Sequence, residues 1–251
     1  MRVFLDIFRL TPRPLLFASA FAFFAAFFAT RFPDVPGASV GSYVSTALIA
    51  LPSVVALFTY FGPRRALLSI VAVSAFAYAI ESVGVATGFP YGAFFYDDAL
   101  GPRLFGLVPY LLPVTYVPLV IGAVAAARSG GHIAPRILIS ALLLVAVDAV
   151  LDPGAAALGF WIWPDGGPYY GVPLSNFAGW LLSGAVSATL LLYIGRPQTP
   201  PPPGTLDSLV LATAFWTGAA LFSTLIAPTL LGVLLFAFFL VRRSRLRSHR
   251  K

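Results

Sequence analysis

The sequence has no cysteine, only two histidines and few charged side chains. The absence of cysteine excludes disulfide bonds, thiolate metal sites and a cysteine nucleophile. The histidines, His132 and His249, lie in polar segments, so the sequence predicts no haem, zinc or other metal site. Charged residues are 10% of the chain, whereas soluble domains carry roughly 25%. Because 59% of the residues are hydrophobic, too few polar groups remain to cover a water-facing surface, and the chain is expected to fold in a bilayer.

Apolar runs long enough to span a membrane recur along the whole chain. A spanning helix needs about 20 largely apolar residues. The last long run is divided by a turn at Ala227-Pro228-Thr229, because proline disfavours helix in the residue before it. The sequence therefore predicts an all-α fold, a polytopic transmembrane bundle of about eight helices, at residues 15–31, 42–61, 66–86, 109–127, 136–152, 174–195, 207–224 and 226–241.

Basic residues are distributed unevenly between the two ends of these helices. If the N- and C-termini are both cytoplasmic, all 16 lysines and arginines except Arg31 and Arg103 lie on the cytoplasmic side. This arrangement follows the positive-inside rule, whereas seven spans would place the basic tail outside. The net charge of +7 thus indicates orientation in the plasma membrane and contact with anionic lipid, rather than nucleic-acid binding.

A proline-rich segment divides the chain near its end. Residues 196–206 contain four consecutive prolines and are typical of a stiff, extended linker. The segment separates a membrane bundle, residues 1–195, from a terminal helical hairpin and basic tail, residues 207–251. Because the hairpin carries no polar motif, we interpret it as structural and expect the active-site core within residues 41–195.

Three carboxylates fall inside predicted helices near the outer face. Glu81, the only glutamate, lies in the third helix, Asp148 lies inside the fifth, and Asp152 closes the fifth. A charge at membrane depth costs about 2.5–3.5 kcal/mol on insertion scales, so such residues indicate a functional site; the alternative is a hydrogen bond between packed helices. Asp148 and Asp152 are four residues apart and share one helix face. Asn176, at the start of the sixth helix, adds an amide at the same level.

Two outer loops rich in aromatic residues follow these acids. Glu81 and Asp152 are each followed seven residues later by Gly-Phe, then by aromatics and a Gly-Val-Pro-like start of the next helix. An interfacial aromatic belt explains aromatics at this level but not the likeness of the two loops. The pattern predicts a parallel duplication of a helix–loop–helix unit around one site.

Taken together, the motifs resemble the membrane-embedded carotenoid hydratase family, which includes bisanhydrobacterioruberin hydratases and carotenoid 1,2-hydratases. The resemblance covers about residues 41–195. It implies a cofactor-independent enzyme that adds water to the terminal C1–C2 double bond of an acyclic carotenoid and forms a tertiary alcohol. The motifs are Glu81-Ser-Val-Gly84, Gly88-Phe-Pro-Tyr-Gly92, Asp148-x-x-x-Asp152-Pro153, Gly159-Phe-Trp-Ile-Trp163 and Tyr169-Tyr-Gly-Val-Pro-Leu-Ser-Asn176.

Hydration of an alkene requires a proton donor, a shelter for a cation and a positioned water. A buried carboxyl can supply the proton and a second can orient the water. We expect Glu81 or Asp152 to be the acid, with Asp148 as the third catalytic carboxylate; Asp148 and Asn176 would position the reacting groups. Aromatic faces attract the cation. The predicted substrate-binding residues are Tyr78, Tyr91, Tyr96, Trp161, Trp163, Tyr170 and Asn176. The expected partners are an acyclic carotenoid from the bilayer, membrane lipid and other membrane enzymes of the carotenoid pathway.

Three other functions share some of these features. Carotenoid end-group cyclisation also begins with protonation of an alkene and differs mainly in excluding water. Membrane prenyltransferases use aspartate motifs like Asp148-x-x-x-Asp152, but they need a second such motif and basic phosphate partners. A proton-linked transporter of small solutes would use buried acids, usually with inverted repeats rather than a parallel one.

Overall fold

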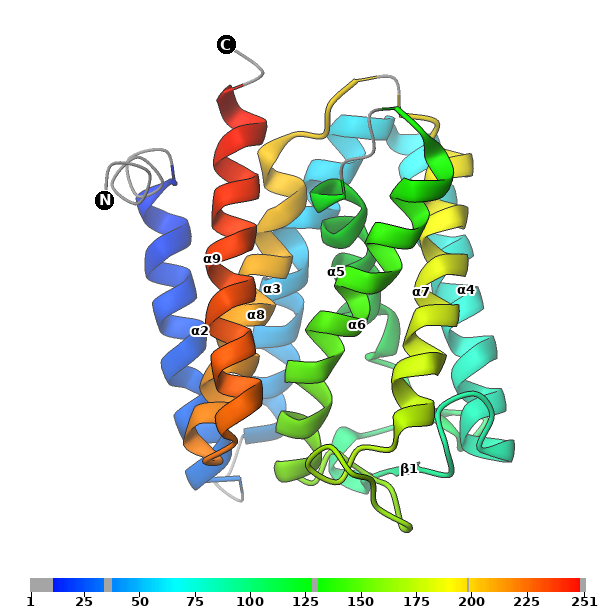
Figure 1. The fold of residues 1–251 in the computed structure, drawn as a ribbon, viewed down its shortest axis with the longest axis vertical. Helices are drawn as coiled ribbons and strands as arrows, with labels where there is room; N and C mark the ends of the chain where they lie inside the picture. The colour runs from blue at the N-terminus through cyan, green and yellow to red at the C-terminus, as the bar shows by residue number, and fades with distance from the viewer. Residues whose placement is uncertain (1–10, 34–37, 128–130, 198, 249–251) are drawn as a thin grey trace.

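The computed structural model describes residues 11–33, 38–127, 131–197 and 199–248. Within these residues the fold is a bundle of eight α-helices with two short two-stranded sheets (Figure 1). The helices are α2 (Arg13–Arg31), α3 (Ala38–Phe61), α4 (Pro63–Thr87), α5 (Leu112–Ala126), α6 (Ile133–Ala157), α7 (Leu174–Gly195), α8 (Asp207–Phe222) and α9 (Ile226–Ser248). The short elements are β1 (Phe95–Tyr96), β2 (Arg103–Leu104), β3 (Val108–Pro109), β4 (Trp161–Ile162), and the 3-10 helices η1 (Asp98–Leu100) and η2 (Pro203–Leu206).

The predicted polytopic helical bundle is confirmed. Of the helices in the described residues, seven are long and apolar enough to cross a membrane, counting α8 together with η2, and α5 is an eighth, shorter apolar helix. The predicted division of residues 207–241 is confirmed too, because α8 ends at Phe222 and α9 begins at Ile226. The turn lies slightly before the predicted position, and Pro228 falls in the first turn of α9, where its missing N–H is tolerated.

The helices alternate in direction, so the ends of the bundle differ in composition. Helix α2 begins and α9 ends at one end, and the α4–α5 and α6–α7 loops lie at the opposite end (Figure 1). Arg31, at the end of α2, and Arg103, in β2, lie at this loop end. All other described arginines lie near the opposite end: Arg13, Arg64, Arg65, Arg136, Arg196, Arg242, Arg243, Arg245 and Arg247.

The terminal hairpin packs into the bundle rather than beside it. Helix α8 contacts α2, α3, α5, α6 and α9, and most of its length is buried. Buried serines join α8 to α3: Ser208 Oγ donates to Ala50 O at 3.0 Å, and Ser53 N donates to Ser208 Oγ at 3.0 Å. Arg243 of α9 forms an ion pair with Asp207 at the start of α8. Helix α8 is therefore placed to form a wall of the bundle interior.

Helix α5 is shorter than predicted at both ends. The predicted helix began at residue 109, but Val108–Pro109 form β3, which pairs with Arg103–Leu104. With 15 residues at 1.5 Å each, α5 is about 22 Å long. Two arginines satisfy the carbonyls at its C-terminal end: Arg136 Nη2 donates to Val124 O at 3.1 Å and Arg242 Nη2 to Ala126 O at 2.7 Å. The guanidinium groups also complement the negative end of the helix dipole.

Helix α6 continues through Pro153 to Ala157, which corrects the prediction that Asp152 closes this helix. Proline has no N–H, so it leaves the carbonyl of Ala149 without its helical partner. The hydroxyl of Tyr169, from the following loop, donates to Ala149 O at 3.1 Å. The Tyr169 hydroxyl replaces the N–H donor that Pro153 lacks, so the helix continues. Asp152 therefore lies in the interior of α6, one turn after Asp148.

The two loops have matching turns, as the predicted duplication requires. Leu107 N donates to Leu104 O at 3.0 Å, and Val172 N donates to Tyr169 O at 3.0 Å. The central residues, Phe105-Gly106 and Tyr170-Gly171, all have positive φ, the pattern of a type I′ turn. The loops also pair directly, since β1 is antiparallel to β4 with Tyr96 opposite Trp161. The units α4–α5 and α6–α7 thus share direction, turn type and a common sheet.

Candidate active site

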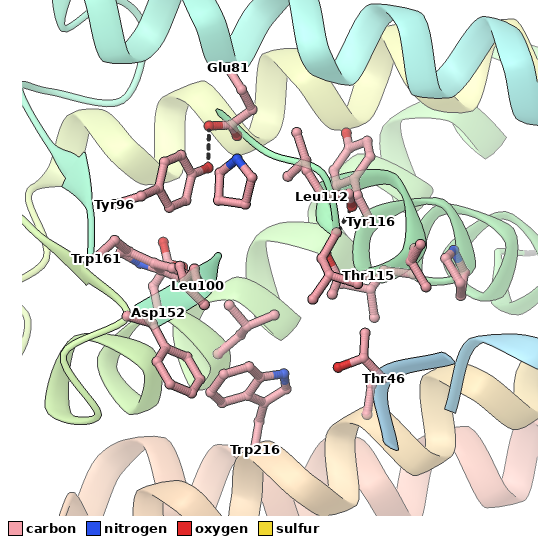
Figure 2. Close-up of a pocket in the computed structure, with 18 of the residues that line it drawn as sticks. Thr46, Glu81, Tyr96, Leu100, Leu112, Thr115, Tyr116, Asp152, Trp161 and Trp216 are labelled. Atoms are coloured by element: carbon pink, nitrogen blue, oxygen red, sulfur yellow. Dashed lines mark hydrogen bonds between the residues drawn. The ribbon is translucent and has the colours of Figure 1, made fainter. Parts of the chain in front are cut away.

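The interior of the bundle contains a cavity of about 200 Å³ near the loop end. Helices α3 to α8 and both aromatic loops contribute to its walls, and all four tryptophans of the chain lie along it. Figure 2 shows Glu81, Tyr96, Trp161 and Asp152 along one side, with Thr46 and Thr115 across from them. The predicted site residues that line the cavity are Glu81, Asp152, Tyr91, Tyr96, Trp161, Trp163 and Asn176.

Glu81 reaches the cavity from α4 and is held by a tyrosine of its own loop. Tyr96 Oη donates to Glu81 Oε2 at 2.9 Å (Figure 2). Burial, followed by the nearby Glu81 charge, raises the pKa of Tyr96 well above its ordinary value. Tyr96 therefore stays protonated and remains a donor, and the Tyr91 side chain also lies within hydrogen-bonding range of Glu81.

One amide connects the two aspartates of α6 to α7. Asn176 Nδ2 donates to Asp148 Oδ2 at 2.9 Å and to Asp152 Oδ2 at 2.5 Å. Asp152 lines the cavity, whereas Asp148 is fully buried behind it. Within the described part of the chain, Asp148 Oδ1 has no hydrogen-bond partner. Asp148 is thus connected through Asn176 to Asp152, which lines the cavity.

The two acids occupy equivalent places in the duplicated units. Tyr96 bonds Glu81, and the Trp161 side chain lies beside Asp152 (Figure 2). These two aromatics are paired in the β1–β4 ladder, with ring centroids 6.0 Å apart. Each acid is therefore supported by an aromatic from its own loop, and both acids face a single cavity. Asp148 has no counterpart, because Ala77 occupies the corresponding position before Glu81.

A second pair of aromatic residues also occupies equivalent positions in the two duplicated units. Tyr116 and Trp180 each lie seven residues after the proline that precedes their helix, Pro109 and Pro173. Their rings meet edge to face with centroids 5.7 Å apart, and both line the cavity. Edge-to-face packing is a favourable arrangement of two aromatic rings, so this contact joins α5 to α7 at the cavity wall.

Tyr91 forms the roof of the cavity and depends on two glycines. A Cβ atom at Gly84 would lie 2.7 Å from the Tyr91 ring, and one at Gly179 would meet the opposite edge of the same ring. The ring is only 3% exposed and is held between α4 and α7. The absence of a side chain at Gly84 and Gly179 therefore allows the Tyr91 ring to enter between the two helices.

Two predicted binding residues lie elsewhere. Tyr78 is not among the described residues that line the cavity; its hydroxyl donates to Tyr110 O at 2.9 Å and joins α4 to the start of α5. Tyr170 is also outside the cavity lining, is 42% exposed, and accepts a hydrogen bond from Ala227 N at 3.2 Å. The prediction that these two line the pocket is therefore corrected, because their rings face the joints between elements.

The sequence reasoning missed one wall of the cavity. Trp216 and Phe215 of α8 line it, together with hydroxyl side chains of α3 and α5: Ser42, Ser45, Thr46 and Thr115. Trp216 packs against Gly154, where a Cβ would lie 3.2 Å from the indole ring, and against Phe160. The one signal in the sequence was Trp216 itself, the fourth tryptophan.

Among the described residues, no group of three or more acidic or histidine side chains is arranged to hold a metal ion.

Comparison with known proteins identifies the family of this chain. The sequence model of a family described as carotenoid biosynthesis protein matches residues 38–239. The bisanhydrobacterioruberin hydratase of Haloarcula japonica is 42% identical over 203 residues, which cover 76% of this chain and 68% of that protein. The chain belongs to the carotenoid biosynthesis protein family. The resemblance to the carotenoid hydratases is thereby confirmed, and the matched range extends beyond residues 41–195 to include α8 and most of α9. No solved structure matches the chain.

Proposed function

We propose that this protein hydrates the terminal C1–C2 double bond of an acyclic carotenoid by acid catalysis. The observation that carries the proposal is the placement of Glu81 and Asp152 on one apolar, tryptophan-lined cavity in a bilayer bundle. The 42% identity to a protein named as a hydratase supports the same reaction. The chain's own carboxyls supply the acid and base that the reaction needs.

The hydrogen bonds favour a division of labour between the carboxyls. Glu81 accepts the O–H of Tyr96 and lines the cavity, so it is placed to deliver a proton to a bound end group. Asp152 accepts an N–H from Asn176, so it is held as an acceptor. In the proposed reaction Glu81 protonates C2, a tertiary cation forms at C1, and water adds to C1. Asp152 takes the proton released by that water. Return of this proton from Asp152 to Glu81 restores both carboxyls, so the net change over a full cycle is the addition of one water.

The walls of the cavity suit a cationic intermediate. Aromatic faces attract a cation by about 2 kcal/mol or more when the site is desolvated. Trp161, Trp180 and Trp216 surround the space between the acids and the far wall. The same apolar walls limit the number of water molecules near the cation. Reaction of the cation with the water that Asp152 orients is therefore favoured over reaction with other waters.

The proposed site lies near the outer face of the plasma membrane. This placement rests on the basic residues at the opposite end of the bundle, which indicate the cytoplasmic side. A carotenoid dissolved in the bilayer would present its end group at this level, where water is available. Other membrane enzymes of the carotenoid pathway would then share a common lipid pool of substrate with this protein.

The test is expression of the chain in a colourless host that makes lycopene, and in a second host that makes an elongated acyclic carotenoid. Extracted pigments are analysed by mass, alongside Glu81→Gln and Asp152→Asn, with Asp165→Asn, an exposed loop residue, as the matched control. We expect a product heavier than its precursor by one water, formed with the control and lost with both site variants. A product of unchanged mass but altered retention would instead indicate cyclisation. Absence of any product in both hosts, with the protein present in the membrane, would refute the proposal.

A further inference from the structure

The cavity is closed at both of its ends along the bundle. At the loop end it is covered by a cluster of buried side chains that includes Tyr91, Phe94, Tyr96 and Trp163. Towards the other end, Leu57, Ile121 and Leu209 fill the space between α3, α5 and α8, each at most 2% exposed. A long chain such as a carotenoid therefore cannot enter along the bundle axis and needs a path between two helices.

Most of the interfaces between neighbouring helices beside the cavity are closed by specific contacts. Ser53 and Ser208 exchange hydrogen bonds across α3 and α8. Trp216 packs against Gly154 and closes the contact between α8 and α6. The Tyr91 ring fills the space between α4 and α7, and the hydroxyl of Tyr78 joins α4 to the start of α5. These contacts leave the interface between α3 and α5 as the remaining route into the cavity.

The cavity reaches the surface between α3 and α5. Among the described residues that line it, Ser42 and Thr115 are the exposed ones, and they lie on these two neighbouring helices. The lining residues around them are half-buried: Ser45, Thr46, Leu111 and Val114. Next to them, the outer face of α3 is strongly apolar and exposed, as expected for contact with lipid; its side chains are Val40, Val44, Leu48, Leu51 and Val55.

The rim of this opening is fixed by the first aromatic loop. Tyr43 Oη donates to Leu100 O at 2.7 Å and holds η1 against the start of α3. Gly101 follows with φ +83°, and a Cβ at this position would meet the Tyr43 hydroxyl. The small side chains of Ser42, Ser45 and Thr115 leave the gap beneath this rim unfilled.

We propose that the gap at Ser42 and Thr115, the α3–α5 opening, is a lateral opening through which a long apolar isoprenoid chain passes from the bilayer to the acids. The chemical identity of that chain rests on the proposed function. The opening faces lipid, is continuous with the cavity and lies across it from Glu81 and Asp152 (Figure 2). A chain that enters here presents its end group to the acids while its remainder stays in the membrane.

The natural absence of cysteine gives a clean test, because an introduced cysteine is the single site for a maleimide. Ser42→Cys and Thr115→Cys would each be treated with N-phenylmaleimide in membranes and compared with the same variant before treatment. Val44→Cys is the matched control: Val44 is two residues from Ser42 on α3 and 54% exposed, but it is not among the described cavity-lining residues. Two signals are read, formation of hydrated product and quenching of the cavity tryptophans by added lycopene.

If the opening is the path, labelling at Ser42→Cys and Thr115→Cys removes most of the hydration rate and most of the quenching, and labelling at Val44→Cys leaves both unchanged. If labelled Ser42→Cys and Thr115→Cys retain both signals like the control, the path lies elsewhere and the proposal is wrong. Should unlabelled proteins quench but form no product, the hydratase assignment fails by itself. Loss of quenching on labelling would then still establish the opening.

Discussion

At the scale of single residues, the amide of Asn176 decides how the site is held together. Its two hydrogens go to Asp148 and Asp152, which lie on consecutive turns of another helix. Each acid is almost fully buried, so neither can exchange this donor for bulk water. The orientation of Asp152 towards the cavity therefore depends on a residue that is not itself ionisable.

Replacing Asn176 with leucine should test this dependence. Hydrogen bonds to charged groups are worth about 1.5–3 kcal/mol, so Asn176→Leu is expected to lower the hydration rate by about tenfold or more. The rate is measured in membranes at equal protein content. Leu174→Ala, an exposed change in the same helix turn, serves as the control. A rate within a factor of two of the wild-type value would show that the aspartates need no such donor.

The hydrogen bond from the Tyr169 hydroxyl to the Ala149 carbonyl leads to a second prediction at the scale of single residues. Tyr169→Phe leaves the carbonyl of Ala149 without a donor, which costs about 1–3 kcal/mol for a buried group. Pro153→Ala restores the helical N–H, so Tyr169→Phe should have little effect in that background. Thermal unfolding of the four proteins in detergent gives the coupling energy directly. Equal effects of Tyr169→Phe in both backgrounds would contradict the explanation given for the continuity of α6.

At the scale of elements, the site is assembled by close approach of helices that belong to different halves of the duplication. Helices α4 and α7 approach each other around the Tyr91 ring, and Gly84 and Gly179 provide the room. The β1–β4 pair then ties together the two loops that follow α4 and α6. The acids are thus placed by contacts between the halves and not by either half alone.

Gly179→Ala should therefore be costly. The added methyl would meet the Tyr91 ring, and overpacking of this kind typically destabilises a protein by about 1–3 kcal/mol. Gly41→Ala is the control, since a Cβ at Gly41, a glycine of α3, has no heavy atom within 4 Å in the described structure. Thermal unfolding reports the difference. Combining Gly179→Ala with Tyr91→Ala should relieve the penalty; an additive loss would place its origin elsewhere.

At the scale of the whole molecule, the uneven distribution of arginines predicts which end is cytoplasmic. Phe105, 86% exposed in the first loop, and Arg245, exposed near the end of α9, lie at opposite ends of the bundle. In the cysteine-free chain, Phe105→Cys should react with a membrane-impermeant maleimide in intact cells. Arg245→Cys should react only after the cells are permeabilised. The reverse pattern would invert the proposed orientation and move the site to the inner face.

Much of this architecture follows from the sequence because the bilayer imposes simple constraints. Apolar runs define most helix boundaries to within a few residues, apart from the ends of α6 and α9, and the cost of buried charge singles out Glu81, Asp148 and Asp152. The direction in which an aromatic side chain points is set by packing, so Tyr78 of α4 and Tyr170 of the second loop could not be distinguished from Tyr96 by spacing. Helices α3 and α8 carry no acid at the cavity, so their part in it follows only from the fold. The end of α6 was misplaced because the donor that compensates for Pro153 is distant in sequence.

The guanidinium of Arg242 has a consequence for how the protein is made. It satisfies the C-terminal carbonyl of α5, at Ala126, which precedes it by 116 residues. During insertion α5 reaches the translocon long before α9 leaves the ribosome, so this carbonyl waits for its donor while three further helices are synthesised. Helix α5 also contributes a wall of the cavity, so Arg242 ties the far end of that wall-forming helix to α9. A chain that stops before Arg242 would therefore contain Glu81, Asp148 and Asp152 but lack the donor that satisfies the C-terminal end of α5.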